Sequence, residues 1–201
     1  MLIEYLFSSL ILFVRIVTIL IFSICLHELG HGIAAIYQGD DTPIKQGHMT
    51  LNPIVHMGVP SLIFLVLVGM AWGAMPVNPH KFRDPKWGHV IVSAAGPATN
   101  FVLAIVAVSL IKISGGNFLE NIISFDFLRL IALFNFALGM FNLLPIPPLD
   151  GFHVASEFFP EMKSFANSQA AMGLLMILFI TGAGSVFFTI SNMMVKFLVN
   201  L

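Results

Sequence analysis

The sequence predicts an all-α membrane protein, a polytopic helical bundle of about four to six membrane segments. Of its 201 residues, 58% are hydrophobic and only 9% are charged, whereas soluble domains carry about a quarter charged residues. The apolar residues form long runs of spanning or near-spanning length, joined by loops too short for an added soluble domain. We therefore expect residues 1–201 to form a single integral membrane domain.

The main partner expected from this composition is the lipid bilayer. The net charge of −1 provides no basic field that would attract nucleic acid, so no nucleic-acid partner is expected. Lys and Arg are divided about evenly between alternate sides of the apolar runs, which leaves the membrane orientation open.

The first apolar run extends from about Tyr5 to Tyr37. As one helix it would be roughly 50 Å long, which exceeds the roughly 30 Å hydrocarbon core. We therefore expect Arg15 to lie at a membrane interface and the span to begin near Ile16. From Ile16 to His27 is about 16 Å of helix, so His27 would lie well inside the bilayer.

Four further apolar segments follow in the chain: 59–77, 88–113, 127–144 and 170–190, the last continuing toward Leu201. Segment 59–77 is interrupted by two prolines and two glycines, so two interpretations stay open. It spans the membrane once, or it enters the membrane and returns as a short re-entrant segment between the first two core helices.

A polar cluster interrupts the first run in FSICLHELGHGIAA, residues 22–35. His27 and His31 are four residues apart, so on a helix they share a face and can direct one nitrogen each to a single metal ion. Glu28 lies about 100° round the helix, where it can reach a metal-bound water. An ionisable side chain at membrane depth costs several kcal/mol and indicates a functional site. The alternative is a trio buried by mutual hydrogen bonds.

A catalytic zinc site usually needs a third protein ligand and keeps one position open for water. The candidates are Asp126, Asp150, Glu157, Glu161 and the other histidines. Asp150 is favoured because it ends FNLLPIPPLDG, residues 141–151, whose prolines cannot continue a helix. Broken backbone at membrane depth must be buried in protein or line a wet cavity. The alternative is an ordinary turn aspartate.

Three motifs together resemble the signatures of the site-2 protease family of intramembrane zinc metalloproteases: HELGH, AAGPATN at 94–100 and NLLPIPPLDG at 142–151. HMTLNPIVHMG and PVNPHKFRDP resemble the compact prokaryotic branch, without PDZ or CBS domains. The resemblance implies one Zn²⁺ per chain bound by His27, His31 and Asp150, with Glu28 as general base. It also implies antiparallel HExxH and GPxxN helices, which favours the re-entrant interpretation of 59–77.

The function expected on this basis is that of an intramembrane zinc metalloendopeptidase in a multi-pass prokaryotic cell membrane. It would hydrolyse peptide bonds of transmembrane proteins or peptides within or near the bilayer, in regulated intramembrane proteolysis. Asn142 is expected to be catalytic, donating a hydrogen bond to the oxyanion or the substrate, or else to join two helices. Asn100 is expected to join helices, or else to face the substrate. The alternative function is a membrane metal-binding protein or transporter that uses the same His/Asp cluster.

A transmembrane substrate must be locally extended before its peptide bond can be attacked. The stretch QGHMTLNP, residues 46–53, is polar and could supply an edge β-strand that pairs with such a substrate. An interfacial loop is the other interpretation. The identity of the substrate, a regulatory membrane partner and the oligomeric state are left open by the sequence.

Overall fold

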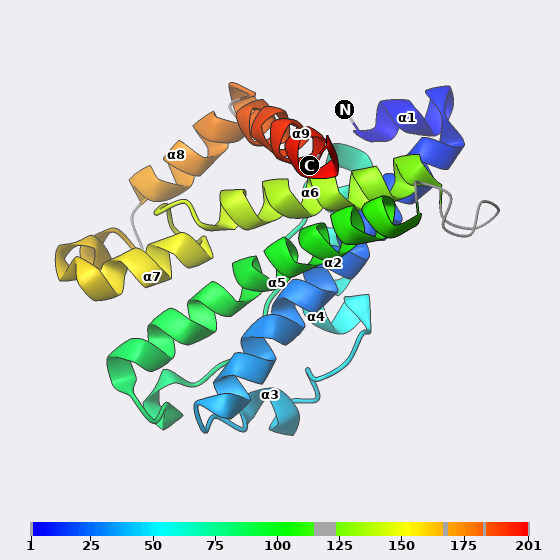
Figure 1. Cartoon of the computed structure of the whole chain (residues 1–201). Coiled ribbons are helices and arrows are strands. Elements are labelled where there is room, and N and C mark those ends of the chain that lie inside the picture. Colours follow the sequence, from blue (N-terminus) through cyan, green and yellow to red (C-terminus); the bar gives the residue numbers. More distant parts are fainter. Residues whose placement is uncertain (1, 115–123, 167–168, 183, 201) are drawn as a thin grey trace.

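The computed structural model describes residues 2–114, 124–166, 169–182 and 184–200, and this part of the chain is helical without a strand (Figure 1). The predicted all-α fold is therefore confirmed. Its elements, in chain order, are α1 (Leu2–Ser8), α2 (Leu10–Tyr37), α3 (Thr42–Lys45), α4 (Pro53–Val68), η1 (Pro79–Lys81), α5 (Pro85–Ser114), α6 (Phe125–Asn142), α7 (Asp150–Phe158), η2 (Pro160–Phe165), α8 (Gln169–Ile180) and α9 (Gly184–Asn200).

Helices α2, α5 and α6 are each long and apolar enough to cross a membrane, and α4 is a shorter apolar helix. These helices make the protein a multi-pass membrane protein. Small side chains let α5 and α6 pack closely, with Ala104 and Ala107 of α5 in one core cluster with Ala132 of α6 and Val195 of α9. Such close approach of backbones is typical of helix packing in membranes.

The first long helix begins before Arg15, and the position of Arg15 at a membrane interface stays a prediction. Helix α2 is continuous through Arg15, and the break between α1 and α2 lies at Ser9, whose φ is −159° and ψ is 87°. The guanidinium carbon of Arg15 lies 5.9 Å from the centre of the Phe127 ring. A long charged side chain can extend along an apolar surface without disturbing its backbone, so Arg15 does not end the helix.

Residues 59–77 run in one direction as part of α4 and then turn back beside it. Helix α4 ends at Gly69, whose φ of +87° turns the chain back, and the following residues run beside α4 toward its start. Ser61 Oγ accepts a hydrogen bond of 2.9 Å from Trp72 N, and Ala74 N donates one of 2.9 Å to His56 O. Of the two interpretations, the structure has the re-entrant one. Residues 69–77 are called the return segment below.

Two further segments were interpreted from the sequence. Residues 46–52 form turns and bends, with Gly47 at a φ of +71°, so of the two interpretations of residues 46–53 the structure has the loop. The C-terminal apolar segment is also two helices, α8 and α9, instead of one. Between them Gly182 has a φ of +69°, a left-handed conformation that ends a helix readily.

Candidate metal centre

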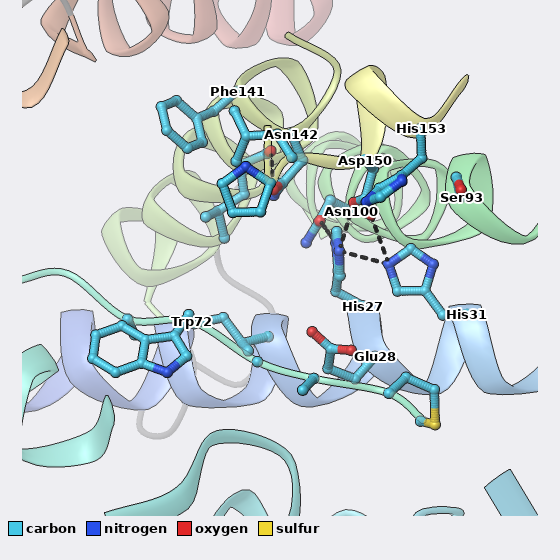
Figure 2. Close-up of a pocket in the computed structure, with 18 of the residues that line it drawn as sticks. His27, Glu28, His31, Trp72, Ser93, Asn100, Phe141, Asn142, Asp150 and His153 are labelled. Carbon is cyan, nitrogen blue, oxygen red and sulfur yellow. Dashed lines mark hydrogen bonds and ion pairs between the residues drawn. The ribbon is translucent and has the colours of Figure 1, made fainter. Parts of the chain in front are cut away.

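Three side chains, from two helices that are far apart in the sequence, converge on one point (Figure 2). His27 and His31 project from the middle of α2, and Asp150 is the first residue of α7. Nε2 of His31 lies 3.0 Å from Nε2 of His27, while the Asp150 carboxylate lies 3.0 Å from the Nε2 of His27 and 3.3 Å from that of His31. The three ligand atoms lie within 4.8 Å of one another, close enough to hold one metal ion.

The other nitrogen of each imidazole determines what these atoms can do. Nδ1 of His31 lies 2.7 Å from the backbone oxygen of Val92, which can only accept, so Nδ1 carries the proton and Nε2 a lone pair. Nδ1 of His27 lies 2.6 Å from Oδ1 of Asn100, with the same consequence. The two Nε2 atoms are therefore acceptors that face an acceptor carboxylate.

The carboxylate of Asp150 meets these two nitrogens. Its buried Oδ2 has no hydrogen-bond donor among the described residues, as expected when Nε2 of His27, 3.0 Å away, carries a lone pair. Converging acceptors without a donor are unfavourable in a buried site unless a cation lies between them. Two imidazoles and one carboxylate, with a hydrogen-bond acceptor facing the other nitrogen of each imidazole, are a donor set that suits zinc.

The backbone break after α6 brings Asp150 to this point. Prolines 145, 147 and 148 lie between the end of α6 and the start of α7, so the predicted interruption of the helix is confirmed. The next residue, Gly151, packs directly against the backbone of Leu143 and Leu144, and an added Cβ would overlap both. Only glycine permits this approach, which places Asp150 over the histidines of α2.

Two more glycines keep the space around the cluster open. A Cβ on Gly96 of α5 would collide with Nε2 of both His27 and His31. A Cβ on Gly73 of the return segment would collide with the carboxylate of Glu28. Glu28 therefore lies between the metal cluster and the backbone of the return segment.

A cavity of about 770 Å³ extends from the cluster. Its lining includes His27, Glu28, His31 and Asp150, the return segment, and side chains of α5, α6 and the two C-terminal helices. The volume lies within the usual range for ligand pockets. The cavity is mainly apolar, and its polar groups are concentrated near the cluster.

The two asparagines singled out in the sequence occupy different places. Asn142 lines the cavity, and its Nδ2 donates a 3.0 Å hydrogen bond to Leu138 O in the same helix. Its predicted catalytic role stays a prediction. Asn100 joins α5 to α6 by donating to Asn135, as expected of an interhelical residue, but it also contacts His27. That contact was not predicted from the sequence, and neither were the contacts of Asn135 and Val92 O near the cluster. An amide in an apolar span was the available signal for Asn135.

A polar anchor joins the end of the return segment to the end of α2. The buried carboxylate of Asp40 accepts hydrogen bonds from Asn78 N at 2.6 Å and Thr42 N at 2.9 Å. Burial alone would raise the pKa of Asp40, but these hydrogen bonds, with Lys81 nearby, bring it below its ordinary value. The neighbouring Asp41 pairs with Lys45 and Lys81, which lowers its pKa to about 2.

Comparison with known families identifies the chain. The family model described as Peptidase family M50 matches residues 15–125 and 109–183, a range that contains the HExxH helix, α5, α6 and Asp150. The chain belongs to peptidase family M50. This is the site-2 protease family, so the family resemblance drawn from the three motifs is confirmed.

Curated relatives of this M50 chain carry metalloprotease names. YwhC of Bacillus subtilis is 35% identical over 191 residues, which cover 90% of this chain and 87% of YwhC. Rip2 of Mycolicibacterium smegmatis is 32% identical over 177 residues, covering 82% of this chain and 65% of Rip2. Both are named zinc metalloproteases by provisional assignment.

A more distant relative is named zinc metalloprotease MJ0392, from Methanocaldococcus jannaschii. It is 27% identical over 176 residues, which cover 84% of this chain and 43% of that protein. No solved structure matches the chain. The M50 chain is thus similar in sequence to proteins named as zinc metalloproteases, along most of its length.

Proposed function

We propose that this M50 protein is an intramembrane zinc metalloendopeptidase of a prokaryotic cell membrane, which cleaves transmembrane proteins or peptides within or near the bilayer. The observation that carries the proposal is the convergence of Nε2 of His27, Nε2 of His31 and the Asp150 carboxylate, all of them acceptors in the tautomers that Asn100 and Val92 O favour. The family, the zinc metalloprotease names of its relatives and their bacterial and archaeal sources support it.

The residues of the cluster would hold one Zn²⁺ through the Nε2 atoms of His27 and His31 and the carboxylate of Asp150. When bound, zinc acts as a Lewis acid that lowers the pKa of a water toward neutrality and polarises a carbonyl. Asn100 and Val92 O keep both imidazoles in the tautomer that presents a lone pair.

Glu28 would be the general base. Its carboxylate borders the cavity one residue from His27, where it can accept a proton from the attacking water and deliver it to the leaving amine. A carbon–oxygen bond forms at the scissile carbonyl and the carbon–nitrogen bond breaks. Asn142 would donate a hydrogen bond to the oxyanion after its Nδ2 leaves Leu138 O.

The return segment would bind the extended substrate, in place of residues 46–53. The backbone of Trp72 and Ala74 is hydrogen bonded toward α4. Because alternate residues of an extended chain face opposite sides, the backbone groups of Ala71, Gly73 and Met75 would be directed away from α4 and toward a substrate. No hydrogen bond joins these groups to another described residue, and Gly73 adjoins Glu28. This is a suitable edge for strand addition.

A metal transporter is the competing function. Transport needs ligands at successive positions along a path, whereas the described part of the chain contains a single group of three metal-ligating side chains. That group also has a glutamate beside it, which a transporter does not need. The arrangement therefore favours hydrolysis.

Replacing Glu28 by Gln tests the proposal. The variant keeps the three ligands and should retain zinc, while cleavage of a transmembrane reporter peptide in proteoliposomes should fall by about 10²–10⁴-fold. Glu161→Gln makes the same change at an exposed position of η2 and should leave cleavage unchanged. Cleavage by Glu28→Gln at the wild-type rate would refute the general-base role.

A further inference from the structure

Four side chains from three helices form a buried hydrogen-bonded chain beside the metal cluster. Nδ1 of His27 lies 2.6 Å from Oδ1 of Asn100, Nδ2 of Asn100 donates to Oδ1 of Asn135 at 2.9 Å, and Nδ2 of Asn135 donates to Oγ of Ser23 at 2.9 Å. Ser23 and His27 belong to α2, Asn100 to α5 and Asn135 to α6. We call these four residues the amide relay; His27 and Asn100 are seen in Figure 2.

The direction of the relay is set at the end away from the metal. Nδ2 of Asn135 also lies 2.9 Å from the backbone oxygen of Ile131, which can only accept a hydrogen bond. The NH₂ group of Asn135 must therefore face Ile131, and its oxygen must face Asn100. Asn100 then directs its NH₂ to Asn135 and its oxygen to His27.

The consequence reaches the metal cluster. An oxygen facing Nδ1 of His27 requires a proton on Nδ1, which leaves Nε2 of His27 with the lone pair that a metal ligand needs. The two histidines differ in this respect. Backbone Val92 O holds the proton of His31 in place, whereas His27 depends on a side-chain amide that could rotate.

Burial keeps the relay intact. Asn100 and Asn135 are each 1% exposed, and Ser23 is 3% exposed, so water does not replace a lost partner. A fully bonded polar network in a low-dielectric interior is rigid, while a partly bonded one is unfavourable. Asn135 is therefore the group that prevents Asn100 from turning over.

We propose that Asn135 is a positioning residue for the metal centre, which orients Asn100 and thereby holds His27 in its metal-binding tautomer. This inference rests on the proposed function in one respect, that His27 is a zinc ligand. Asn135 itself lies two hydrogen bonds from His27 and touches neither metal nor substrate.

Asn135→Leu tests the proposal, because leucine has a similar branched shape and no hydrogen-bonding group. In this variant Asn100 can turn its NH₂ toward His27, which favours the tautomer protonated on Nε2. We expect zinc affinity of the full chain in detergent, measured by chelator competition, to fall about 10- to 100-fold. A fall of less than twofold would overturn the proposal.

The matched control is Asn192→Leu. Asn192 of α9 accepts a 2.8 Å hydrogen bond from Arg129 of α6, so this variant also loses one interhelical hydrogen bond but leaves the relay intact. Its zinc affinity should stay within twofold of wild type. An equal loss of affinity in both variants would indicate general loosening of the bundle and would overturn the positioning role.

Two readouts separate positioning from structural support. The first readout is the ¹⁵N NMR spectrum of zinc-free protein with ¹⁵N-labelled histidine, in which the His27 signals are assigned by their loss in His27→Ala. These signals should report the Nδ1-protonated form in wild type and both tautomers in Asn135→Leu. Zinc binding by Asn100→Ala should not weaken further when Asn135→Leu is added, since Asn135 acts through Asn100. An unchanged tautomer or additive losses would contradict the relay.

Other outcomes are also decisive. If Asn135→Leu does not fold, Asn135→Ala replaces it, because alanine is smaller than asparagine and cannot crowd its neighbours. The same fall in zinc affinity and the same mixture of His27 tautomers are expected for this variant. Wild-type protein that binds no zinc would refute the metal centre itself. Wild-type affinity in an Asn135 variant would refute only the relay.

Discussion

Oδ2 of Asp150 lies 3.0 Å from Nε2 of His27, and neither atom has a proton to share when His27 donates through Nδ1 to Asn100. A contact between two acceptors is favourable only with a cation between them. The position of Asp150 thus joins two motifs, from opposite halves of the chain, into one centre.

Asp150→Ala should abolish tight zinc binding. The variant leaves only two imidazole ligands, fewer than the three protein ligands of catalytic zinc sites, so zinc should fall from about one per chain to a small fraction. Elemental analysis of detergent-purified protein measures this directly. Asp126→Ala, at an exposed position of α6, is the control. Zinc retained by Asp150→Ala would remove Asp150 from the centre.

Gly96→Ala should displace zinc without changing any ligand. The added methyl group would overlap Nε2 of both His27 and His31, so the imidazoles must move apart or lose the ion. We expect at least about a tenfold fall in zinc affinity, as for other disturbances of a metal site. Gly173→Ala in α8, where a Cβ meets nothing within 4 Å, should bind zinc normally. Equal zinc affinities of the two variants would contradict this account.

Gly73→Ala should separate binding of zinc from catalysis. Its methyl group would overlap the carboxylate of Glu28 and not the ligands. Because small displacements of a catalytic group cost about 10²-fold in rate, kcat should fall by about that factor while the zinc content stays at the wild-type level. Zinc loss, or an unchanged kcat, would contradict the proposed role of Glu28 as a general base beside the return segment.

Ser61→Ala should weaken substrate binding more than chemistry. Ser61 Oγ bonds both N and O of Trp72, so its removal frees one edge of the return segment from α4. If the other edge binds the extended substrate, KM should rise several-fold while kcat and zinc content change little. Thr189→Ala, which removes a hydroxyl bonded only within α9, is the control. A rise in KM shared by both variants would argue against the return segment as the substrate edge.

Asp40 should make the anchor of the return segment sensitive to acid. Its folded-state pKa is lowered relative to an unfolded value of about 3.9. Its stabilising contribution is therefore fully present above the unfolded pKa and is lost as the pH falls through the lower, folded pKa. Asp40→Asn should destabilise the anchor by about 1–3 kcal/mol at neutral pH.

The difference between wild type and Asp40→Asn should disappear at the acid end of that window. Thermal unfolding and hydrogen exchange of the Thr42 and Asn78 amides, followed from pH 6 downward, measure it. A difference that persists unchanged below about pH 3, roughly a unit below the ordinary Asp value, would contradict the assignment.

Local patterns in the sequence predicted much of the fold and part of the candidate site. The pairing of His27 with His31 follows from helical periodicity alone, and the interrupted helix before Asp150 follows from its prolines. Other features depended on context. The contact of Arg15 with the Phe127 ring could not be predicted, because it joins the N-terminal part of α2 to α6. For residues 46–53 the sequence left a substrate-pairing strand and a loop open, and it gave no sign that the return segment adjoins Glu28.

The sequence by itself determined that this is a helical membrane protein with an HExxH helix, because hydrophobic run length and i, i+4 spacing act within one segment. The tertiary structure decided which groups surround that motif. Asn135 and Val92 O reach the relay and His31 only because α2, α5 and α6 pack in one particular register. That register depends on small residues at the helix crossings and on glycines such as Gly96, which meets His27 and His31 far away in the chain.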